Sequence, residues 1–312
     1  MSHYLLIFSI TIGMVFSFGE SAECAPQQRV RFKDIVYPDI SVKKNISYFP
    51  DSRDDVKEKY YLLDFYEPAG DTSTLRPLII WIHGGGFKFG KKTSRGIPLW
   101  SKEFAQKGYV CAAINYRLSK KNPLSKRADL VSACSDAMED VRKVIDFFRK
   151  NSTQYRIDLS KIILAGNSAG GITALQSVYS NPELLEYPNQ AESNPPANPK
   201  ANPDNVVAII NFWGAFLNIN WLKNAEVPIV SVHGDKDKIV PPDNPEKGLF
   251  GSIVIHREAD KLQIPNQIKI YRGFAHELQK GFNPLWVSRA VKKRWSEAGE
   301  FAAAFLYDQL FG

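Results

Sequence analysis

From residue 78 onward, short apolar runs alternate with segments in which apolar residues recur every three to four positions. A short continuous apolar run is typical of a strand buried on both faces, and the longer spacing is typical of an amphipathic helix. The apolar runs are Leu78–Ile82, Tyr109–Ile114, Ile162–Ala165, Val206–Phe212, Pro228–Val232 and Ile268–Tyr271. The helical segments are Pro98–Lys107, Leu130–Lys150, Ala169–Tyr179, Ser252–Leu262 and Leu285–Leu310. This alternation predicts an α/β fold, with a mostly parallel central sheet and helices on both faces.

The chain before residue 78 follows a different pattern. Three short strands are predicted there, at Arg29–Phe32, Ile40–Tyr48 and Tyr60–Tyr66, and Pro68 and Gly70 then signal a turn. Strands without intervening helices pair most readily in an antiparallel manner. We therefore expect an antiparallel N-terminal edge on the sheet.

The N-terminus carries a targeting signal. Tyr4–Phe18 is apolar except for Ser, Thr and Gly, and small residues follow at Gly19, Ser21, Ala22 and Ala25. The run is too short for a comfortable membrane span, and no later segment is long enough either. We predict a signal peptide at residues 1–25 and export to the periplasm or the medium, although the usual N-terminal Lys or Arg is missing. A retained anchor and a cytosolic terminus are the alternatives.

Residues 26–312 are predicted to form one α/β domain, which suits their number. One stretch interrupts the alternation of predicted strands and helices, because Asn181–Asn205 contains six prolines and six asparagines. Nothing in this stretch is suited to a core, and it is too long for an ordinary connection. We interpret residues 181–205 as an insertion loop whose role is open.

Composition narrows the possible partners. Apolar residues make up 44% of the chain and charged residues 23%, which is ordinary for a globular enzyme. The formal net charge is +7, but Lys and Arg are interspersed with Asp and Glu, which argues against a nucleic-acid site. The oligomeric state stays open. So does the state of Cys111 and Cys134, which are either a disulfide or two buried thiols.

The sequence G-N-S-A-G occupies residues 166–170, directly after a predicted strand and directly before a predicted helix. A G-x-S-x-G motif in this context is typical of a nucleophile elbow, a sharp turn that exposes its serine above the sheet. The glycines allow the backbone to fold tightly around a strained residue. The motif therefore indicates Ser168 as a nucleophile, with a helix-capping serine as the alternative.

The sequence H-G-G-G-F occupies residues 83–87, directly after the run Leu78–Ile82. Acyl transfer passes through an oxyanion that needs preorganised donors, and consecutive glycines leave backbone N–H groups unobstructed. We expect an oxyanion hole formed by the N–H groups of Gly85, Gly86 and Ala169. The alternative is a tight turn without a ligand.

Together, H-G-G-G-F and the following G-N-S-A-G-G resemble the α/β-hydrolase superfamily, in its HGGG-containing serine esterase and lipase branch. The resemblance covers nearly all of the chain from about Tyr60 onward. It implies an α/β-hydrolase fold, Ser168 as the nucleophile and residues 83–87 as the oxyanion loop. Asn167 is a departure, because relatives commonly carry Asp or Glu before the nucleophile.

The acid and the base follow the nucleophile in chain order. H-G-D-K-D at residues 233–237, followed by Val240 and Pro241, resembles the superfamily pattern H-G-x-x-D-x-x-V-P and places the acid on Asp237. Asp235 is the competing carboxylate. Of the histidines after the acid, His276 follows the last predicted strand, whereas His256 lies in a predicted helix. We therefore predict His276 as the base that accepts the Ser168 proton.

Phe212-Trp213-Gly214 and Gly251-Ser252-Ile253 sharpen the resemblance toward bacterial bifunctional feruloyl and acetyl-xylan esterases. The resemblance implies a serine hydrolase that cleaves short or aromatic acyl esters through an acyl-enzyme, with carbohydrates as candidate alcohols. A lipase, a peptidase of the same fold and a non-catalytic binding protein are the alternatives. We predict no metal and no cofactor, because the chain has no metal-ligand cluster, P-loop or dinucleotide fingerprint. Acyl and alcohol specificity and the substrate-binding residues stay open.

Overall fold

The computed structural model describes residues 1, 29–49, 58–180, 202, 204–245, 248–281 and 287–312. Apart from Met1, the predicted signal peptide lies outside these residues, as does most of the 181–205 loop. Nothing in the structure therefore bears on the signal peptide or on the role of that loop.

The central sheet has eight strands in the described part of the chain, in the order β1-β2-β4-β3-β5-β6-β8-β10. β2 pairs with β1 and with β4 in an antiparallel manner, and each of the other neighbouring pairs is parallel. The predicted parallel sheet with an antiparallel N-terminal edge is confirmed. The strands are β1 (Ile40–Ser47), β2 (Leu62–Pro68), β3 (Arg76–Ile82), β4 (Val110–Ile114), β5 (Ile157–Asn167), β6 (Val206–Phe212), β8 (Ile229–Gly234) and β10 (Asn266–Tyr271).

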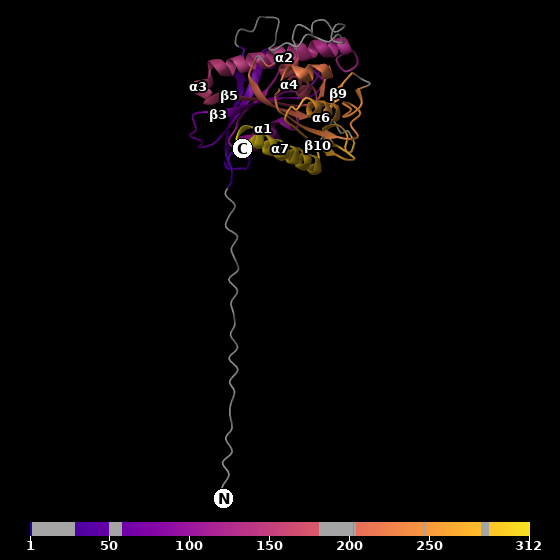
Figure 1. Cartoon of the computed structure of the whole chain (residues 1–312). Coiled ribbons are helices and arrows are strands. Elements are labelled where there is room, and N and C mark those ends of the chain that lie inside the picture. Colours follow the sequence, from indigo (N-terminus) through magenta and orange to yellow (C-terminus); the bar gives the residue numbers. More distant parts are fainter. Residues whose placement is uncertain (2–28, 50–57, 181–201, 203, 246–247, 282–286) are drawn as a thin grey trace.

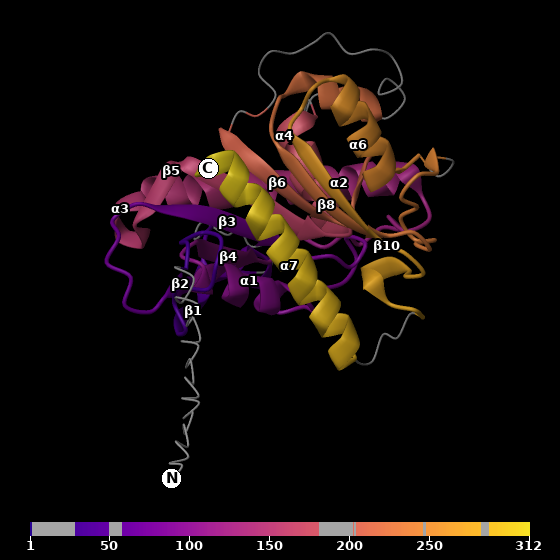
Figure 2. The same ribbon diagram turned by 60° about the horizontal axis from the view of Figure 1, so that its bottom comes forward.

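Helices cover both faces of this sheet, as Figures 1 and 2 show. The helices of one face pack into a core with Leu78, Ile80 and Ile82 of β3, and those of the other face pack with Ile79 and Trp81. Alternate residues of one strand thus serve two cores, which explains the continuous apolar run in the sequence. The first face carries α2 (Arg127–Lys150), α4 (Ala169–Tyr179) and α6 (Ser252–Lys261), and the second carries α1 (Ile97–Gln106) and α7 (Arg289–Leu310).

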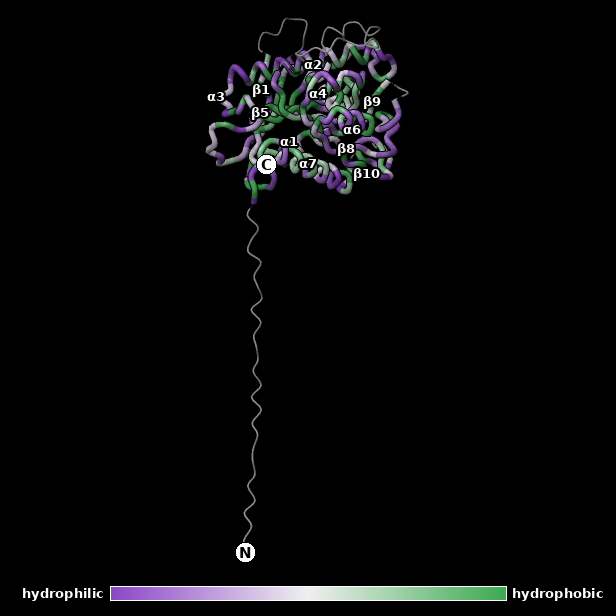
Figure 3. Tube along the Cα trace, in the orientation of Figure 1, coloured by the Kyte–Doolittle hydropathy of each residue, from purple (hydrophilic) through white to green (hydrophobic). Residues whose placement is uncertain are grey.

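Shorter elements complete the described chain, and the sequence pattern did not predict them. They are α3 (Ser152–Tyr155), the antiparallel pair β7 (Ala215–Phe216) and β9 (Phe250–Gly251), and the 3-10 helices η1 (Glu58–Tyr61), η2 (Ile219–Asn224) and η4 (His276–Leu278). In Figure 3, hydrophobic stretches lie mainly inside the domain and hydrophilic ones mainly outside. Within the described ranges, no helix combines the length and the apolar character that a membrane crossing requires.

The strand predicted at Arg29–Phe32 is wrong, because residues 31–34 form a turn. The Arg31 guanidinium is held by the Asp71 carboxylate at 2.7 Å, and Phe32 has a left-handed φ of 70°. The turn is tied to the end of α1 by a bond of 2.9 Å from Lys107 Nζ to the Lys33 carbonyl. These distant contacts override a local pattern that held only two apolar positions.

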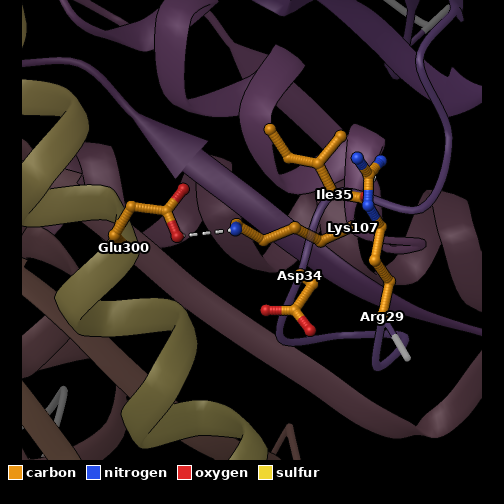
Figure 4. A pocket seen from close by; sticks show the side chains of 5 residues that line it. All are labelled: Arg29, Asp34, Ile35, Lys107 and Glu300. Carbon is orange, nitrogen blue, oxygen red and sulfur yellow. Dashed lines mark hydrogen bonds and ion pairs between the residues drawn. The ribbon is translucent and has the colours of Figure 1, made fainter. Parts of the chain in front are cut away.

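Figure 4 shows the hollow beside this turn, which Arg29, Asp34 and Ile35 line together with Lys107 and Glu300. The Lys107 side chain is buried and pairs with Glu300 of α7 at 2.8 Å. This ion pair links the turn to the helical layer on that side of the sheet. The hollow shares no lining residue with the cavity beside Ser168, which is described below.

Cys111 and Cys134 are two separate buried thiols. Cys111 lies on β4 and packs in the core beneath α1 and α7, whereas Cys134 lies on α2 in the core of the opposite face. Because the sheet separates the two cores, the disulfide alternative is wrong.

The sheet brings the candidate site together. β3, β5, β8 and β10 are parallel and in one sheet, so the loops that follow them leave from the same edge. In open α/β sheets, ligands bind at this carboxyl edge. The loop after β5 carries Ser168, the loop after β8 carries Asp237, and the loop after β10 carries His276.

One close backbone contact fixes the turn at the end of β5. A Cβ atom at Gly170 would overlap the carbonyl oxygen of Ile82, which is the last residue of β3. A backbone atom in the centre of a sheet cannot move aside as the end of a side chain can. The start of α4 therefore approaches β3 only because residue 170 is glycine.

We expect Gly170→Ala to lower the free energy of unfolding by about 3 kcal/mol, because α4 must move away from a packed sheet. Urea unfolding followed by circular dichroism measures this change. Gly281→Ala is the matched control, since a Cβ there meets open space, and its effect should stay within about 0.5 kcal/mol. Equal unfolding midpoints for Gly170→Ala and the unsubstituted protein would contradict the packing argument.

Candidate active site

Ser168 occupies the turn between β5 and α4 in a strained conformation. Its φ of 53° and ψ of −120° lie outside the regions that residues with side chains favour, which costs on the order of 1–3 kcal/mol. The Ser168 N–H donates to the Phe212 carbonyl at 2.8 Å, so the neighbouring strand β6 holds the turn in place. Strain of this kind turns a side chain out of the strand direction and over the carboxyl edge of the sheet.

His276 reaches this serine from the loop that follows β10. Its Nε2 lies 3.0 Å from Ser168 Oγ, although the two residues are 108 positions apart in the sequence. The loop is fixed from behind by α7, because Trp295 Nε1 donates to the Glu277 carbonyl at 2.8 Å and Arg294 Nε donates to the Leu278 carbonyl at 2.9 Å. The last helix thus holds the histidine through the two residues that follow it.

Asp237 holds the other nitrogen of the same ring. His276 Nδ1 donates to Asp237 Oδ2 at 2.6 Å, while Oδ1 accepts the N–H groups of Ile239 and Val240, each at 2.9 Å. Burial acts to raise the pKa of Asp237, but hydrogen bonds from His233 and His276 outweigh it and hold the pKa well below its usual range. Asp237 is therefore a buried carboxylate that stays charged.

The two competing residues lie elsewhere. Asp235 is partly exposed, and its Oδ1 accepts the Gly273 N–H at 2.6 Å. His256 is buried on α6, where its Nδ1 lies 2.6 Å from Asn266 Oδ1, and burial lowers its pKa to about 4. The structure thus brings together Ser168, His276 and Asp237, and it places Asp235 and His256 outside this group.

The glycine loop after β3 lies beside Ser168. Gly85 and Gly86 have φ values of 117° and 60°, a region in which glycine alone is unstrained. No acceptor among the described residues takes the N–H groups of Gly85, Gly86 or Ala169. Gly85, Gly86 and Ser168 line one cavity, and Ala169 directly follows Ser168. The predicted oxyanion donors thus lie beside the serine.

Asn167 connects the glycine loop to the serine turn. Its Oδ1 accepts the Gly84 N–H at 3.0 Å, which couples residues that are 83 positions apart. The sequence marked Asn167 only as a departure from the Asp or Glu of relatives, and its contact with Gly84 was not predicted. An uncharged amide at this position accepts the backbone bond without placing a negative charge next to the predicted oxyanion donors.

His83 supports the loop from below. Its ring stacks on Tyr116 at 4.3 Å between ring centroids, and its Nδ1 lies 2.7 Å from the Gly84 carbonyl. Burial lowers the pKa of His83 to about 4, so the ring is neutral at pH 7 and Nδ1 donates to that carbonyl. His83 is therefore a fixed support of the loop.

The cavity beside Ser168 has a volume of about 460 Å³, and its lining has an apolar side and a polar side. Phe89, Leu124 and Ile239 present apolar side chains that are 63%, 67% and 50% exposed. Arg95 and Glu277 supply a polar wall and form an ion pair of 2.7 Å. No pattern in the sequence predicted that these five residues line a cavity, because their meeting depends on tertiary structure. Such a cavity suits a molecule with one apolar end and one polar end.

Chemically, a hydroxyl, an imidazole and a buried carboxylate in one line of hydrogen bonds can activate the hydroxyl as a nucleophile. Unpaired N–H groups beside it can stabilise an oxyanion. Across the ranges that the structure covers, no group of three or more His, Cys, Asp or Glu side chains could hold a metal ion. The geometry is thus suited to acyl transfer by the protein's own side chains.

Comparison with known proteins places the chain in a family. A family model described as BD-FAE matches residues 63–218, which is half of the 312 residues. The match includes the glycine loop and Ser168, and it ends before Asp237 and His276.

Curated relatives are similar over part of their length. The probable carboxylic ester hydrolase LipM of Mycobacterium tuberculosis is 26% identical over 196 residues, which are 62% of this chain and 40% of LipM. Arylacetamide deacetylase of Bos taurus is 26% identical over 199 residues, which are 60% of this chain and 41% of the deacetylase. The aligned part thus spans less than half the length of either relative.

Solved structures share the fold. The apo form of Thermogutta terrifontis esterase 2 has a TM-score of 0.60 at 22% identity, covering 88% of this chain and 96% of the other. A metagenomic α/β-hydrolase enzyme, MGS-M1, has a TM-score of 0.54 at 15% identity, covering 86% and 98%. A truncated carbohydrate esterase from gut microbiota has a TM-score of 0.53 at 18% identity, covering 87% and 99%. The predicted α/β-hydrolase fold is confirmed.

Asp237 also links stability to pH. A carboxyl group whose pKa is lowered on folding contributes stability above its unfolded pKa, near 4, and loses it as the pH falls through the folded pKa. Between about pH 5 and pH 2, we expect the free energy of unfolding of the unsubstituted protein to fall by on the order of 2 kcal/mol more than that of Asp237→Asn.

Urea unfolding at a series of pH values measures this difference. Asp235→Asn is the matched control, because it removes a partly exposed carboxylate only two residues away. Asp235→Asn should lose as much stability between pH 5 and pH 2 as the unsubstituted protein does. An equal loss of stability in Asp237→Asn would mean that the charge of Asp237 does not contribute in this way.

Proposed function

The chain belongs to the BD-FAE family of esterase-like α/β-hydrolases, and from this premise we propose that it is a serine hydrolase that cleaves carboxylic esters. One observation carries the proposal. Ser168, His276 and Asp237 form a continuous line of hydrogen bonds of 3.0 Å and 2.6 Å beside backbone N–H groups that have no acceptor in the described chain. The names of LipM and of the bovine deacetylase agree with this activity.

Acylation begins when Ser168 Oγ attacks the ester carbonyl carbon. His276 Nε2 takes the hydroxyl proton, and Asp237 stabilises the resulting imidazolium through Nδ1. The carbonyl oxygen becomes an oxyanion that accepts hydrogen bonds from Gly85, Gly86 and Ala169. The tetrahedral intermediate then collapses, the C–O bond to the alcohol breaks, and His276 gives its proton to the leaving alkoxide.

Deacylation repeats these steps with water. His276 Nε2 takes a proton from water as the hydroxide oxygen attacks the acyl carbon, and the same N–H groups hold the second oxyanion. When this intermediate collapses, the bond to Ser168 Oγ breaks and the serine recovers its proton from His276. The products are a carboxylic acid and an alcohol, and the protein's groups return to their starting states.

The lining of the cavity supports a class of substrate. An acyl group that is short or aromatic suits the apolar side chains of Phe89, Leu124 and Ile239, while a hydroxyl-rich alcohol suits the polar wall of Arg95 and Glu277. We therefore propose esters that join such an acyl group to a polar alcohol, with carbohydrates as the leading candidates. The fold shared with a gut carbohydrate esterase is consistent with this choice.

We also propose that the protein is exported. The support lies in the sequence, because the apolar run Tyr4–Phe18 and the small residues that follow it fit a signal peptide. An exported enzyme would meet polymeric esters outside the cell.

The first test is hydrolysis by the purified protein of p-nitrophenyl acetate, butyrate and decanoate, methyl ferulate and acetylated xylan. We expect turnover of the short and aromatic esters, and a loss on the order of 10⁶-fold in Ser168→Ala, because the serine, histidine and aspartate act as a unit. Preference for the decanoate would favour a lipase. Equal turnover by Ser168→Ala, or no turnover of any ester by the unsubstituted protein, would refute the proposal.

The second test separates the two carboxylates of the loop after β8. Asp237→Asn should lower kcat by about 10⁴-fold, because an amide favours the wrong tautomer of His276. Asp235→Asn, the matched control, should change kcat by less than about threefold, since Asp235 contacts Gly273 and not His276. The opposite ranking of the two variants would assign the acid to Asp235.

A further inference from the structure

A line of buried polar side chains continues behind Asp237, away from Ser168. His233 Nε2 lies 3.2 Å from Asp237 Oδ2, and its Nδ1 lies 2.8 Å from Ser252 Oγ. Ser252 Oγ in turn lies 3.3 Å from Asn211 Nδ2. His233, Ser252 and Asn211 are fully buried and come from β8, the start of α6 and β6. Residues from three elements of the fold are thus linked by hydrogen bonds to the carboxylate of Asp237.

For a neutral His233 ring, the contacts of this line fix the direction of its hydrogen bonds. His233 Nε2 faces two acceptors, Asp237 Oδ2 and the Val240 carbonyl at 2.8 Å, so it must carry the ring proton. Nδ1 is then an acceptor in the neutral ring, and the Ser252 hydroxyl donates to it. Asn211 Nδ2 donates to Ser252 Oγ, since Asn211 Oδ1 already accepts the Gly214 N–H at 3.0 Å.

The same carboxylate oxygen serves both histidines. Oδ2 of Asp237 accepts from His276 Nδ1 at 2.6 Å and from His233 Nε2 at 3.2 Å, while Oδ1 is occupied by two backbone N–H groups. These histidines are the titratable side chains that contact the carboxylate in the described part of the chain. Each donor stabilises the negative charge, and a charge that is shared among more donors attracts any one of them less.

We propose that His233 is a positioning residue of the proposed reaction: with its Nε2 proton fixed by two acceptors and its Nδ1 held by Ser252, it donates to Oδ2 of Asp237 and so limits how strongly Asp237 binds the protonated ring of His276. The inference rests on the proposed function, in which His276 is the base. The Val240 carbonyl alone would satisfy a buried Nε2–H, so the contact with Oδ2 is additional to what packing requires. Because the site is buried, little solvent is present to weaken the interaction.

The consequence has a definite sign. Without the Nε2–H donor, the Asp237 carboxylate binds the imidazolium form of His276 more strongly. A higher pH is then needed to free Nε2 as a base, and the acid limb of the pH profile of kcat/KM moves to higher pH. A side chain that only filled space would, on removal, lower the stability or the amount of active protein and leave the position of this limb unchanged.

The test compares four variants of the full chain in pH profiles of kcat/KM for p-nitrophenyl acetate. We expect His233→Leu to move the acid limb up by about one pH unit. One charge-assisted hydrogen bond changes the protonation equilibrium of His276 roughly tenfold, and a tenfold change corresponds to one pH unit. His233→Gln keeps an N–H donor, so its acid limb should lie close to that of the unsubstituted protein. Ser252→Ala removes the hydroxyl that donates to Nδ1, which weakens the Nε2–H donor at the other side of the ring, and it should move the limb in the same direction by less.

The fourth variant is the matched control. His256→Leu removes another buried histidine, which contacts Asn266 rather than Asp237, and it should leave the limb unmoved. An unmoved limb in folded His233→Leu would overturn the proposal. If His233→Leu does not fold, Ser252→Ala decides the matter by the same criterion.

A second readout separates this inference from the proposed function. Titration of ¹⁵N-histidine-labelled protein by NMR reports the His233 tautomer and the protonation of His276 without any substrate. If the unsubstituted protein hydrolyses no ester, the proposed function fails, and the NMR titration still decides whether His233→Leu raises the midpoint of His276. Protonation of His233 at Nδ1 rather than Nε2 at neutral pH would also overturn the proposal.

Discussion

The close contact between the start of α4 and the end of β3 is the constraint on which the site depends. Gly170 lies so near the Ile82 carbonyl that no side chain fits, and the turn that makes this approach holds Ser168 in its strained conformation of positive φ. The same approach brings Asn167 within reach of Gly84, so that the serine turn and the glycine loop are held by one another. The strain at Ser168 persists because the sheet on one side and the helix on the other leave the turn no alternative path.

The site also buries the negative charge of Asp237. An isolated carboxylate in the interior would be strongly destabilising, and Asp237 avoids this cost by accepting hydrogen bonds on both of its oxygens. Those bonds come from the residues just after it and from two histidines on separate strands or loops. A charge that is fully satisfied in this way can stay in place without help from water.

Much of this arrangement follows from local sequence. Continuous apolar runs predicted the parallel strands, and the positions of Ser168, Asp237 and His276 after β5, β8 and β10 predicted that their side chains would share one edge of the sheet. The strand expected at Arg29–Phe32 was wrong, because contacts with Asp71 and Lys107 decide that segment. The contacts of Asn167 and His233 were also missed. The contacts of Asn167 with Gly84 and of His233 with Ser252 join residues whose meeting depends on how strands and helices are arranged, which no short motif records.

The hold of α7 on the loop after β10 means that two separate segments of the chain hold the nucleophile and the base of the proposed reaction. The serine turn and the glycine loop are held by Phe212 and Asn167, which lie at the ends of β6 and β5. His276 is held from the C-terminal helix, because Arg294 and Trp295 bind the carbonyls of the two residues that follow it. The contacts of α7 described above therefore bear on the imidazole, whereas the strands of the sheet hold the serine.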